Sequence, residues 1–182
     1  MRTLLLRSLF ARPVTIGAPK PDKLSRDDAM LTELGRALEV KAKRLYGRSI
    51  TIREVDAGSC NGCELEIHAL NNAVYDVERF GIRFAASPRH ADVLLVTGPV
   101  SHNMKVALER TYAATPDPKW VVAVGDCAAG CGVFADSYAT VGALEKVLPV
   151  DLVIKGCPPQ PIDLLKGLIT LMDRATAKNA AV

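Results

Sequence analysis

The sequence predicts an α/β fold, flavodoxin-like, with a mainly parallel sheet of four to five strands and flanking helices. Short apolar runs alternate with segments of helical periodicity along most of the chain. The run over 92–98 is apolar almost throughout and ends in glycine, which is typical of a strand buried on both faces. The chain has 182 residues, 49% hydrophobic and 24% charged, which suits one soluble globular domain.

The chain begins with a basic, leucine-rich segment over residues 1–20, which contains no acidic residue. We expect it to form an amphipathic segment that contacts a membrane surface or a partner. A frayed tail and a cleaved targeting peptide are the alternatives. Its apolar run is interrupted by Arg7 and is too short to span a bilayer, so we expect it to be retained. With a Pro- and Gly-containing linker, this segment makes up residues 1–24.

A helix is expected next, over residues 25–48. Ser25 is a suitable N-cap because acidic residues follow it in the first turn. Leucines from Leu31 to Leu45 keep helical spacing, and Gly47 is suited to end the helix.

Residues 49–174 are predicted to form the α/β domain, and residues 175–182 a frayed tail. Apolar runs predict strands over 50–55, 82–85, 92–98, 120–125 and 152–155. Helical periodicity predicts helices over 67–77, 104–113, 139–146 and from Pro161 to 172.

The cysteines follow predicted strands. Cys60 and Cys63 come after the first strand, Cys127 after the fourth and Cys157 after the last. The carboxyl ends of parallel strands meet at one edge of an open sheet, where ligands bind. Glycines next to these cysteines allow close backbone approach to a bulky group. We therefore expect four thiols to meet at this edge.

Four converging thiolates have several possible uses. An iron–sulfur cluster takes four thiolates and tolerates ligands far apart in sequence. A structural zinc ion also takes four cysteines, which would make the chain a zinc-stabilised assembly module. Cys60 and Cys63 could instead form a thiol redox pair, and unligated structural cysteines are the remaining alternative.

Three motifs carry a resemblance to a known family. The segments around Cys60-Asn61-Gly62-Cys63-Glu64, Gly125-Asp126-Cys127 and Gly156-Cys157-Pro158-Pro159 resemble the cluster-bearing small subunit of membrane-bound [NiFe] hydrogenases of the formate hydrogenlyase and hydrogenase-4 type. They are also similar to the 20-kDa subunit of respiratory NADH:quinone oxidoreductase. The latter typically has two adjacent cysteines in the first motif, so the spacing here favours the hydrogenase branch.

The resemblance implies a flavodoxin-like fold with one [4Fe–4S] cluster on Cys60, Cys63, Cys127 and Cys157. It implies electron transfer between a ferredoxin-like iron–sulfur subunit and a hydrogenase-like large subunit, in a complex with membrane subunits, peripheral to the cytoplasmic face of the cell membrane. The alternative is the equivalent subunit that delivers electrons to quinone. Cys131 would then be an extra, buried cysteine.

Two further expectations concern charge. Glu64 lies beside the cysteines at the start of a helix, where an acid is favoured by the helix dipole. It is also a candidate proton-coupled neighbour of the cluster. A net charge of +3 and an aromatic content of 5% argue against nucleic acid as a partner. The sequence offers no catalytic acid–base set of its own.

Overall fold

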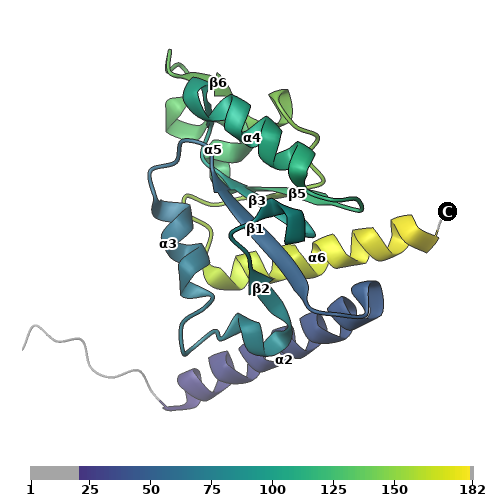
Figure 1. Ribbon diagram of the computed structural model, residues 1–182. Coiled ribbons are helices and arrows are strands. Elements are labelled where there is room, and N and C mark those ends of the chain that lie inside the picture. The colour runs from purple at the N-terminus through teal and green to yellow at the C-terminus, as the bar shows by residue number, and fades with distance from the viewer. Residues whose placement is uncertain (1–20, 181–182) are drawn as a thin grey trace, which may run out of the picture. The chain divides into compact units, whose positions relative to one another are not determined.

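The computed structural model describes residues 21–180 (Figure 1). The chain divides into two compact units between Met30 and Leu31, and the description below concerns the unit from Leu31 onward. The basic segment expected over residues 1–20 lies outside the described residues. Among the helices of the described part, none combines the length and apolarity needed to cross a membrane.

Five parallel strands form the central sheet. Their bounds are β1 Ile50–Asp56, β2 Ile82–Phe84, β3 Val93–Thr97, β5 Trp120–Val124 and β7 Leu152–Ile154. Their order in the sheet is β2-β1-β3-β5-β7, and every neighbouring pair is parallel. This is the flavodoxin-like order, in which β2 lies on one side of β1 and the later strands β3, β5 and β7 lie on the other side. The predicted fold class and all five predicted strands are confirmed.

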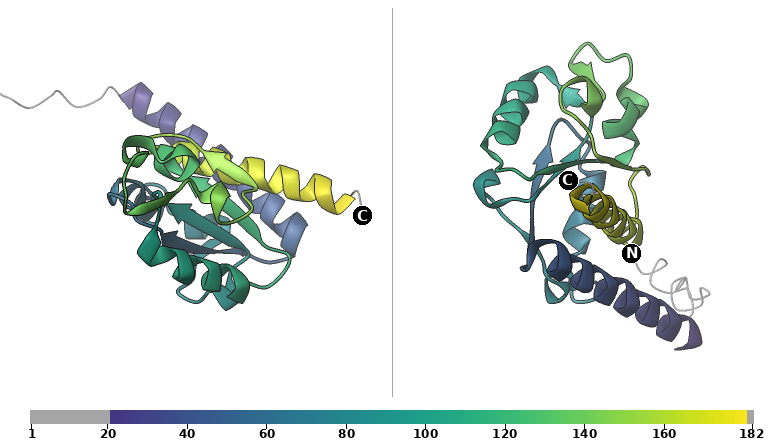
Figure 2. Two further views of the ribbon diagram at one scale, coloured as in Figure 1. Left: turned by 90° about the horizontal axis from the view of Figure 1, so that it is seen from above. Right: turned by 90° about the vertical axis from the view of Figure 1, so that its right-hand side faces the viewer.

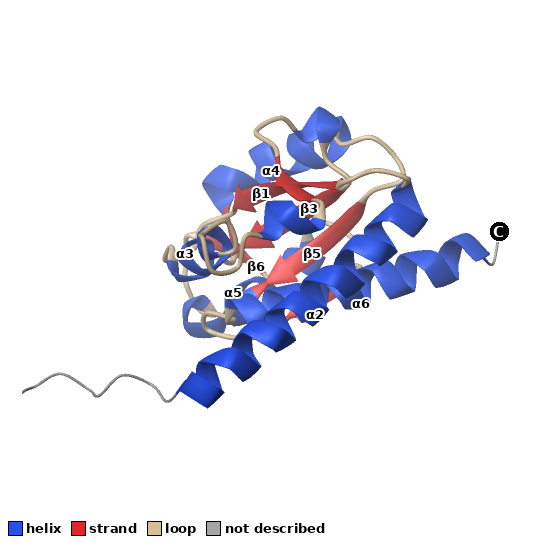
Figure 3. Ribbon diagram, turned by 90° about the horizontal axis from the view of Figure 1, so that it is seen from below, coloured by secondary structure: helices blue, strands red, loops and turns tan. Residues whose placement is uncertain are grey.

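Helices cover both faces of this sheet, so the domain has three layers (Figure 2). Helix α3 (Gly62–Ala69), helix α6 (Pro161–Ala180) and the second half of α2 (Pro21–Tyr46) cover one face. Helices α4 (His102–Ala114) and α5 (Gly125–Gly130) cover the other. Figure 3 shows α6 running toward the C-terminus on the same side of the sheet as the second half of α2.

The two faces of the strands explain the two parts of the core. Every residue of β3 and β5 is buried, because these central strands are covered on both sides. In β3, for example, Leu95 packs in the core beneath α6, whereas Leu94 and Val96 pack beneath α4. This continuous burial is the reason that the strands appear in the sequence as unbroken apolar runs.

A second, smaller sheet replaces one predicted helix. Strand β6 (Thr140–Gly142) pairs antiparallel with β4 (Val100–Ser101), and a single 3₁₀ turn follows over Leu144–Lys146. The helix predicted over 139–146 is therefore wrong. Gly142 has φ +128°, which lies outside the helical region and is a conformation that favours glycine. The backbone of this segment pairs with β4 instead of forming helical hydrogen bonds.

The helix predicted over 67–77 is also corrected. Helix α3 ends at Ala69 because Asn72 forms a turn in which its Oδ1 accepts the N–H groups of Val74, at 2.8 Å, and Tyr75, at 3.0 Å. Val74, which lies inside the predicted helix, is 62% exposed. Three further 3₁₀ turns lie at Val77–Phe80, Pro88–His90 and Gly132–Phe134.

The ends of the two long helices differ from the prediction. Helix α2 spans Pro21–Tyr46 instead of residues 25–48, so the last residues of the expected linker are helical. Proline is accommodated at the start of a helix because its missing N–H is not needed there. Helix α6 continues to Ala180, so the expected tail over 175–182 is helical as far as that residue.

Candidate metal centre

The loops that follow β1, β5 and β7 meet at the carboxyl edge of the sheet. The N–H of Asp126 donates to the carbonyl of Gly156 at 2.9 Å, and the N–H of Gly156 donates to Asp126 Oδ1 at 3.0 Å. These two bonds join the loops that carry Cys127 and Cys157. A Cβ atom on Gly125 would lie 2.6 Å from Cys63 Sγ, so the backbone before Cys127 also contacts the Cys63 thiol.

Polar contacts hold the loop of Cys60 and Cys63 in place. Asp56 Oδ1, at the end of β1, accepts the N–H groups of Gly58 and Ser59, both at 2.7 Å. Ser59 Oγ accepts the N–H of Asn61 at 3.0 Å. Asn61 has φ +70°, and α3 begins directly after it. Cys63 therefore lies in the first turn of α3, with its position set by the turn that precedes the helix.

The loop that follows β3 requires a glycine where it contacts the loop of Cys60 and Cys63. Gly98, which follows β3, has φ +71°, and a Cβ atom there would lie 2.4 Å from the backbone nitrogen of Ser59. The loop after β3 therefore passes directly against the loop of Cys60 and Cys63. The absence of a side chain lets the two backbones touch.

The four predicted ligand residues lie on three neighbouring loops at the carboxyl edge of the sheet. Cys63 and Cys127 are buried, each with 9% exposure, whereas Cys60 and Cys157 are exposed. Burial raises the pKa of the Cys63 thiol to about 12, with further contributions from Glu64 and from the other three thiols. Burial also raises the pKa of Cys127, as do Cys157 and Cys60. Cys60 and Cys157 thus lie close enough to act electrostatically on both buried thiols.

The fifth cysteine occupies a different structural position. Cys131 is buried, with 7% exposure, and terminates α5 with φ +67°. Its N–H donates to the carbonyl of Cys127 at 2.8 Å. The neighbouring Gly132 is close to the candidate centre, because a Cβ atom there would lie 2.9 Å from Cys127 Sγ.

The donor set matches an iron–sulfur cluster in its chemistry. Four thiols without nitrogen or oxygen donors are the ligands of [4Fe–4S] clusters, and also of closed zinc sites. Gly125 and Gly132 leave the space next to two of the sulfur atoms free of side chains. Within residues 21–180, no three His, Cys, Asp or Glu side chains are grouped as a site for one metal ion. Cys60, Cys63, Cys127 and Cys157 would be the residues to hold an iron–sulfur cluster, which would supply a one-electron redox couple.

Glu64 is enclosed beside the cysteines. Its side chain is buried, with 6% exposure, and neither carboxylate oxygen has a hydrogen-bond partner in the described part of the chain. A buried carboxyl group without a partner carries a desolvation cost. The sequence identified this residue by its position next to Cys63.

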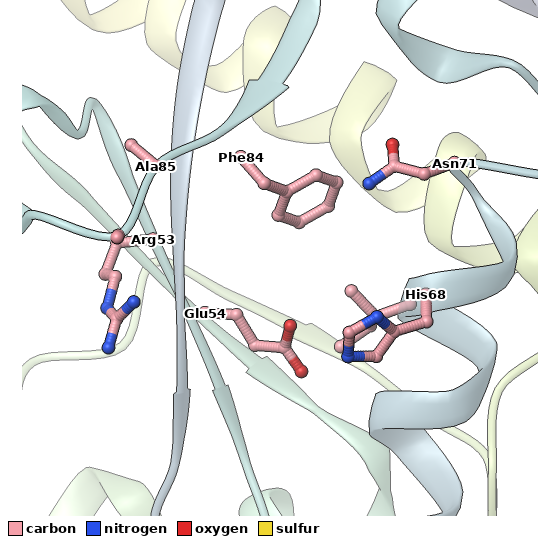
Figure 4. Close-up of a pocket in the computed structure, with 8 residues that line it drawn as sticks. Arg53, Glu54, His68, Asn71, Phe84 and Ala85 are labelled. Carbon is pink, nitrogen blue, oxygen red and sulfur yellow. The ribbon is translucent and has the colours of Figure 1, made fainter.

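A cavity of about 210 Å³ lies between β1 and α3 (Figure 4). Its polar lining includes Glu54 from β1 and His68 and Asn71 from α3 and the turn after it, and Phe84 of β2 closes one side. Glu54 was not identified from the sequence, because an acid inside an alternating strand is typical of a solvated face. Helix α3 covers this part of β1, and Glu54 is therefore half-buried.

The fold and the placement of the thiols define a class of α/β subunit with a thiol-lined carboxyl edge, and comparison with known proteins specifies the family. The model of the NADH ubiquinone oxidoreductase 20-kDa subunit family matches residues 60–171. The chain belongs to this family. The match includes Cys60 at its first residue and extends into α6.

Individual relatives come from several oxidoreductase complexes. A probable membrane-bound hydrogenase subunit of Pyrococcus furiosus is 44% identical over 131 residues, covering 72% of this chain and 78% of that one. Formate hydrogenlyase subunit 7 of Escherichia coli is 46% identical over 120 residues, 66% of this chain but only 47% of that subunit. An NADH-quinone oxidoreductase subunit of Citrifermentans bemidjiense is 46% identical over 119 residues, 65% of this chain and 69% of that one.

A solved structure agrees with both fold and family. A chain of the membrane-bound sulfane sulfur reductase, an archaeal respiratory membrane complex, superposes with a TM-score of 0.64 at 36% identity. The match covers 76% of this chain and 75% of that chain. The predicted resemblance is confirmed, and the relatives are subunits of oxidoreductase complexes, as it implied.

Proposed function

We propose that this chain is an electron-transfer subunit of a membrane-associated, multi-subunit oxidoreductase, and that Cys60, Cys63, Cys127 and Cys157 hold one [4Fe–4S] cluster. The observation that carries the proposal is the meeting of three loops at one sheet edge, with Cys60 and Cys157 close enough to raise the pKa of both Cys63 and Cys127. Residues 49–174 form the domain that binds the cluster. Residues 1–20 contact lipid or protein.

The cluster, when bound, supplies a one-electron redox couple. The protein contributes ligation, position and environment. Asp56, Ser59 and Asp126 fix the loops through hydrogen bonds, so that the thiols are held in place before binding. Burial of Cys63 and Cys127 excludes water from the inner side of the site, and exposure of Cys60 and Cys157 leaves the outer side accessible to a partner.

The partners proposed are a hydrogenase-like large subunit, a ferredoxin-like iron–sulfur subunit and membrane subunits, at the cytoplasmic face of the cell membrane. The relatives named as hydrogenase and formate hydrogenlyase subunits support this assignment. The Cys60-x-x-Cys63 spacing favours the same branch. The second candidate is a subunit that delivers electrons to quinone, which the relative from NADH-quinone oxidoreductase supports.

The test is reconstitution of the full chain without oxygen, followed by measurement of iron, acid-labile sulfide and the EPR spectrum after reduction. About four of each per chain and a spin-half signal are expected for one cubane cluster. Cys157→Ser should lose the signal, and Cys131→Ser should keep it. Bound zinc without labile sulfide would overturn the proposal in favour of a zinc-stabilised assembly module. An unchanged signal in Cys157→Ser would overturn the ligand assignment.

A further inference from the structure

A second pocket, of about 490 Å³, lies at the amino edge of the sheet, opposite the cysteines. Its lining comes from the segments that precede β1, β3 and β5, from β2 and from the turn over Pro88–His90. Strand β3 has five residues, which at about 3.3 Å each separate this edge from the cysteine edge by about 17 Å. The pocket is therefore distinct from the candidate metal centre.

Positive charge exceeds negative charge in this basic pocket, whose lining includes Arg48, Arg83, Arg89 and His90. Asp92 is the one acidic side chain among the described lining residues. Its carboxylate is already paired, because it accepts bonds from Arg48 Nη2 at 2.6 Å and Nη1 at 3.0 Å. Arg83 and Arg89 have no ion pair among the side chains that the structure describes. Two guanidinium charges in the basic pocket are therefore left without a counter-charge.

The fold brings these cations together from separate segments. Arg83 of β2 is the register partner of Thr51 in β1, and both residues line the pocket. Register partners on neighbouring strands direct their side chains to the same face of a sheet. The turn that links β2 to β3 adds Arg89, and the segment before β1 adds Arg48. Guanidinium groups from three segments of the chain thus meet at one pocket.

The chemistry of the lining suits a phosphate group. Guanidinium groups bind phosphate oxygens through paired, charge-assisted hydrogen bonds. Two uncompensated positive charges match a phosphate monoester, which carries nearly two negative charges at neutral pH. A carboxylate carries one charge and would leave part of the positive charge unpaired. The volume lies in the range of about 300–1,000 Å³ that is typical of small-molecule sites, so an organic group also fits beside Ala85 and Pro116.

We propose that the basic pocket binds the phosphate group of a small phosphate ester or of a phospholipid headgroup. Arg83 and Arg89 supply the positive charge that the phosphate neutralises. Asp92 holds Arg48 at the pocket, so that this guanidinium is in position before the ligand arrives. No cysteine takes part, so the inference goes beyond the proposed function and does not depend on it.

The test is isothermal titration calorimetry of the reconstituted full chain with glycerol 3-phosphate, at about pH 7.5 and about 0.15 M salt. Saturable binding is expected. Arg83→Gln and Arg89→Gln should each weaken it roughly tenfold, because each variant loses hydrogen bonds to a charged group. Arg36→Gln makes the same change of charge at an exposed position of α2 outside the pocket, and it should leave the affinity unchanged. Equal weakening in Arg36→Gln would show that only the net charge of the chain matters, and would overturn the site.

Vesicle flotation distinguishes the two sources of the phosphate. The vesicles are phosphatidylcholine with and without phosphatidic acid, whose headgroup is the same glycerol 3-phosphate ester. A lipid ligand predicts that the double variant Arg83→Gln/Arg89→Gln floats less with phosphatidic acid than the unmodified chain does. A soluble ester predicts equal flotation, because both proteins keep the basic residues of segment 1–20. Either result supports the pocket when the calorimetric titration is saturable.

Two results would overturn the inference. One is the absence of saturable binding of glycerol 3-phosphate to the unmodified chain. The other is binding of a polyglutamate peptide without binding of the ester, which would assign the pocket to an acidic protein partner. Far-ultraviolet circular dichroism of each variant checks that it is folded. Iron content is expected to be the same in all variants, so failure of this inference leaves the cluster assignment intact.

Discussion

Asp126 and Gly156 are joined by two hydrogen bonds that run in opposite directions. The backbone N–H of each residue donates to an oxygen of the other, at 2.9 Å and 3.0 Å. One residue precedes Cys127 and the other precedes Cys157. The pair therefore fixes the separation of two cysteines that come from different strands.

Replacing Asp126 should weaken metal retention more than it weakens the fold. Asp126→Ala removes the acceptor of the Gly156 N–H, an exposed bond worth about 1 kcal/mol. A free-energy difference of about 1 kcal/mol corresponds to a factor of about five. We therefore expect the reconstituted variant to lose iron to a chelator roughly fivefold faster than the unmodified chain. Asp126→Asn keeps a side-chain oxygen and is the control. Equal rates in the alanine variant and the unmodified chain would contradict the role assigned to this pair.

Adding one methyl group at Gly125 should disrupt the centre. Gly125 has φ +87°, which strains any other residue, and the new Cβ would lie 2.6 Å from Cys63 Sγ. Gly125→Ala is therefore expected to lose most of its iron and sulfide after reconstitution. Gly130→Ala, at the end of the same short helix, has no atom within 4 Å of the new Cβ and should keep both. Full iron content in Gly125→Ala would show that the Cys63 thiol can move without loss of binding.

Stability depends on a carboxylate at the opposite edge of the sheet. Asp92 has 6% exposure and accepts bonds from Arg48 Nη2 at 2.6 Å, Arg48 Nη1 at 3.0 Å and the N–H of Thr51 at 2.9 Å. Because Arg48 is 57% exposed, we expect Asp92→Ala to cost about 2 kcal/mol, below the range for a fully buried pair.

The cost is measured from the midpoint of urea denaturation, with the dependence of the unfolding free energy on urea concentration unchanged between variants. Lys43→Ala, which removes only the exposed pair with Glu39 at 3.6 Å, should cost less than about 0.5 kcal/mol. A similar cost for both variants would mean that the Asp92 contacts are no more valuable than a surface ion pair.

Alkaline pH should destabilise the protein through Tyr46. Burial raises the pKa of Tyr46 to about 12, and the charge of Asp92 adds to the effect. The folded chain thus holds this proton more tightly than the unfolded chain, whose tyrosine has its ordinary pKa of about 10. The stabilisation is complete below about pH 10 and is lost as pH rises toward about 12.

Tyr46→Phe should therefore lose less stability than the unmodified chain between about pH 9 and pH 11, as measured by urea midpoints. Tyr138→Phe, at a side chain with 96% exposure, is the control and should behave like the unmodified chain. An equal loss in all three proteins would assign the alkaline transition to other groups.

The placement of the cysteine loops at one edge could be predicted because it depends on one property of the sheet. Once β1, β5 and β7 are parallel, their carboxyl ends lie at one edge, whatever the order of the strands. The strand order itself could not be predicted in the same way. It depends on packing between distant segments, such as β3 beside both β1 and β5.

The errors arose where local periodicity resembled a helix and a longer-range contact decided otherwise. Leu144 and Val147 keep helical spacing with Val141, but Gly142 and the pairing with β4 place that segment in a strand and a turn. Glu54 was missed for a related reason. Its half-burial comes from α3 passing over β1, which a strand pattern alone does not contain.

The meeting of the loops that carry Cys60 and Cys157 also constrains how the protein is made. A ribosome adds about 5–20 residues per second, so the first cysteine pair emerges several seconds before the last thiol is synthesised. Within residues 21–180, strand β7, which precedes Cys157, pairs with β5 alone, and it must join the sheet before the four cysteines can come together. Until then, Cys60 and Cys63 meet oxidants and free metal ions without their partners. If these four thiols hold a cluster, it can be completed only after the last of them has been synthesised and β7 has joined the sheet.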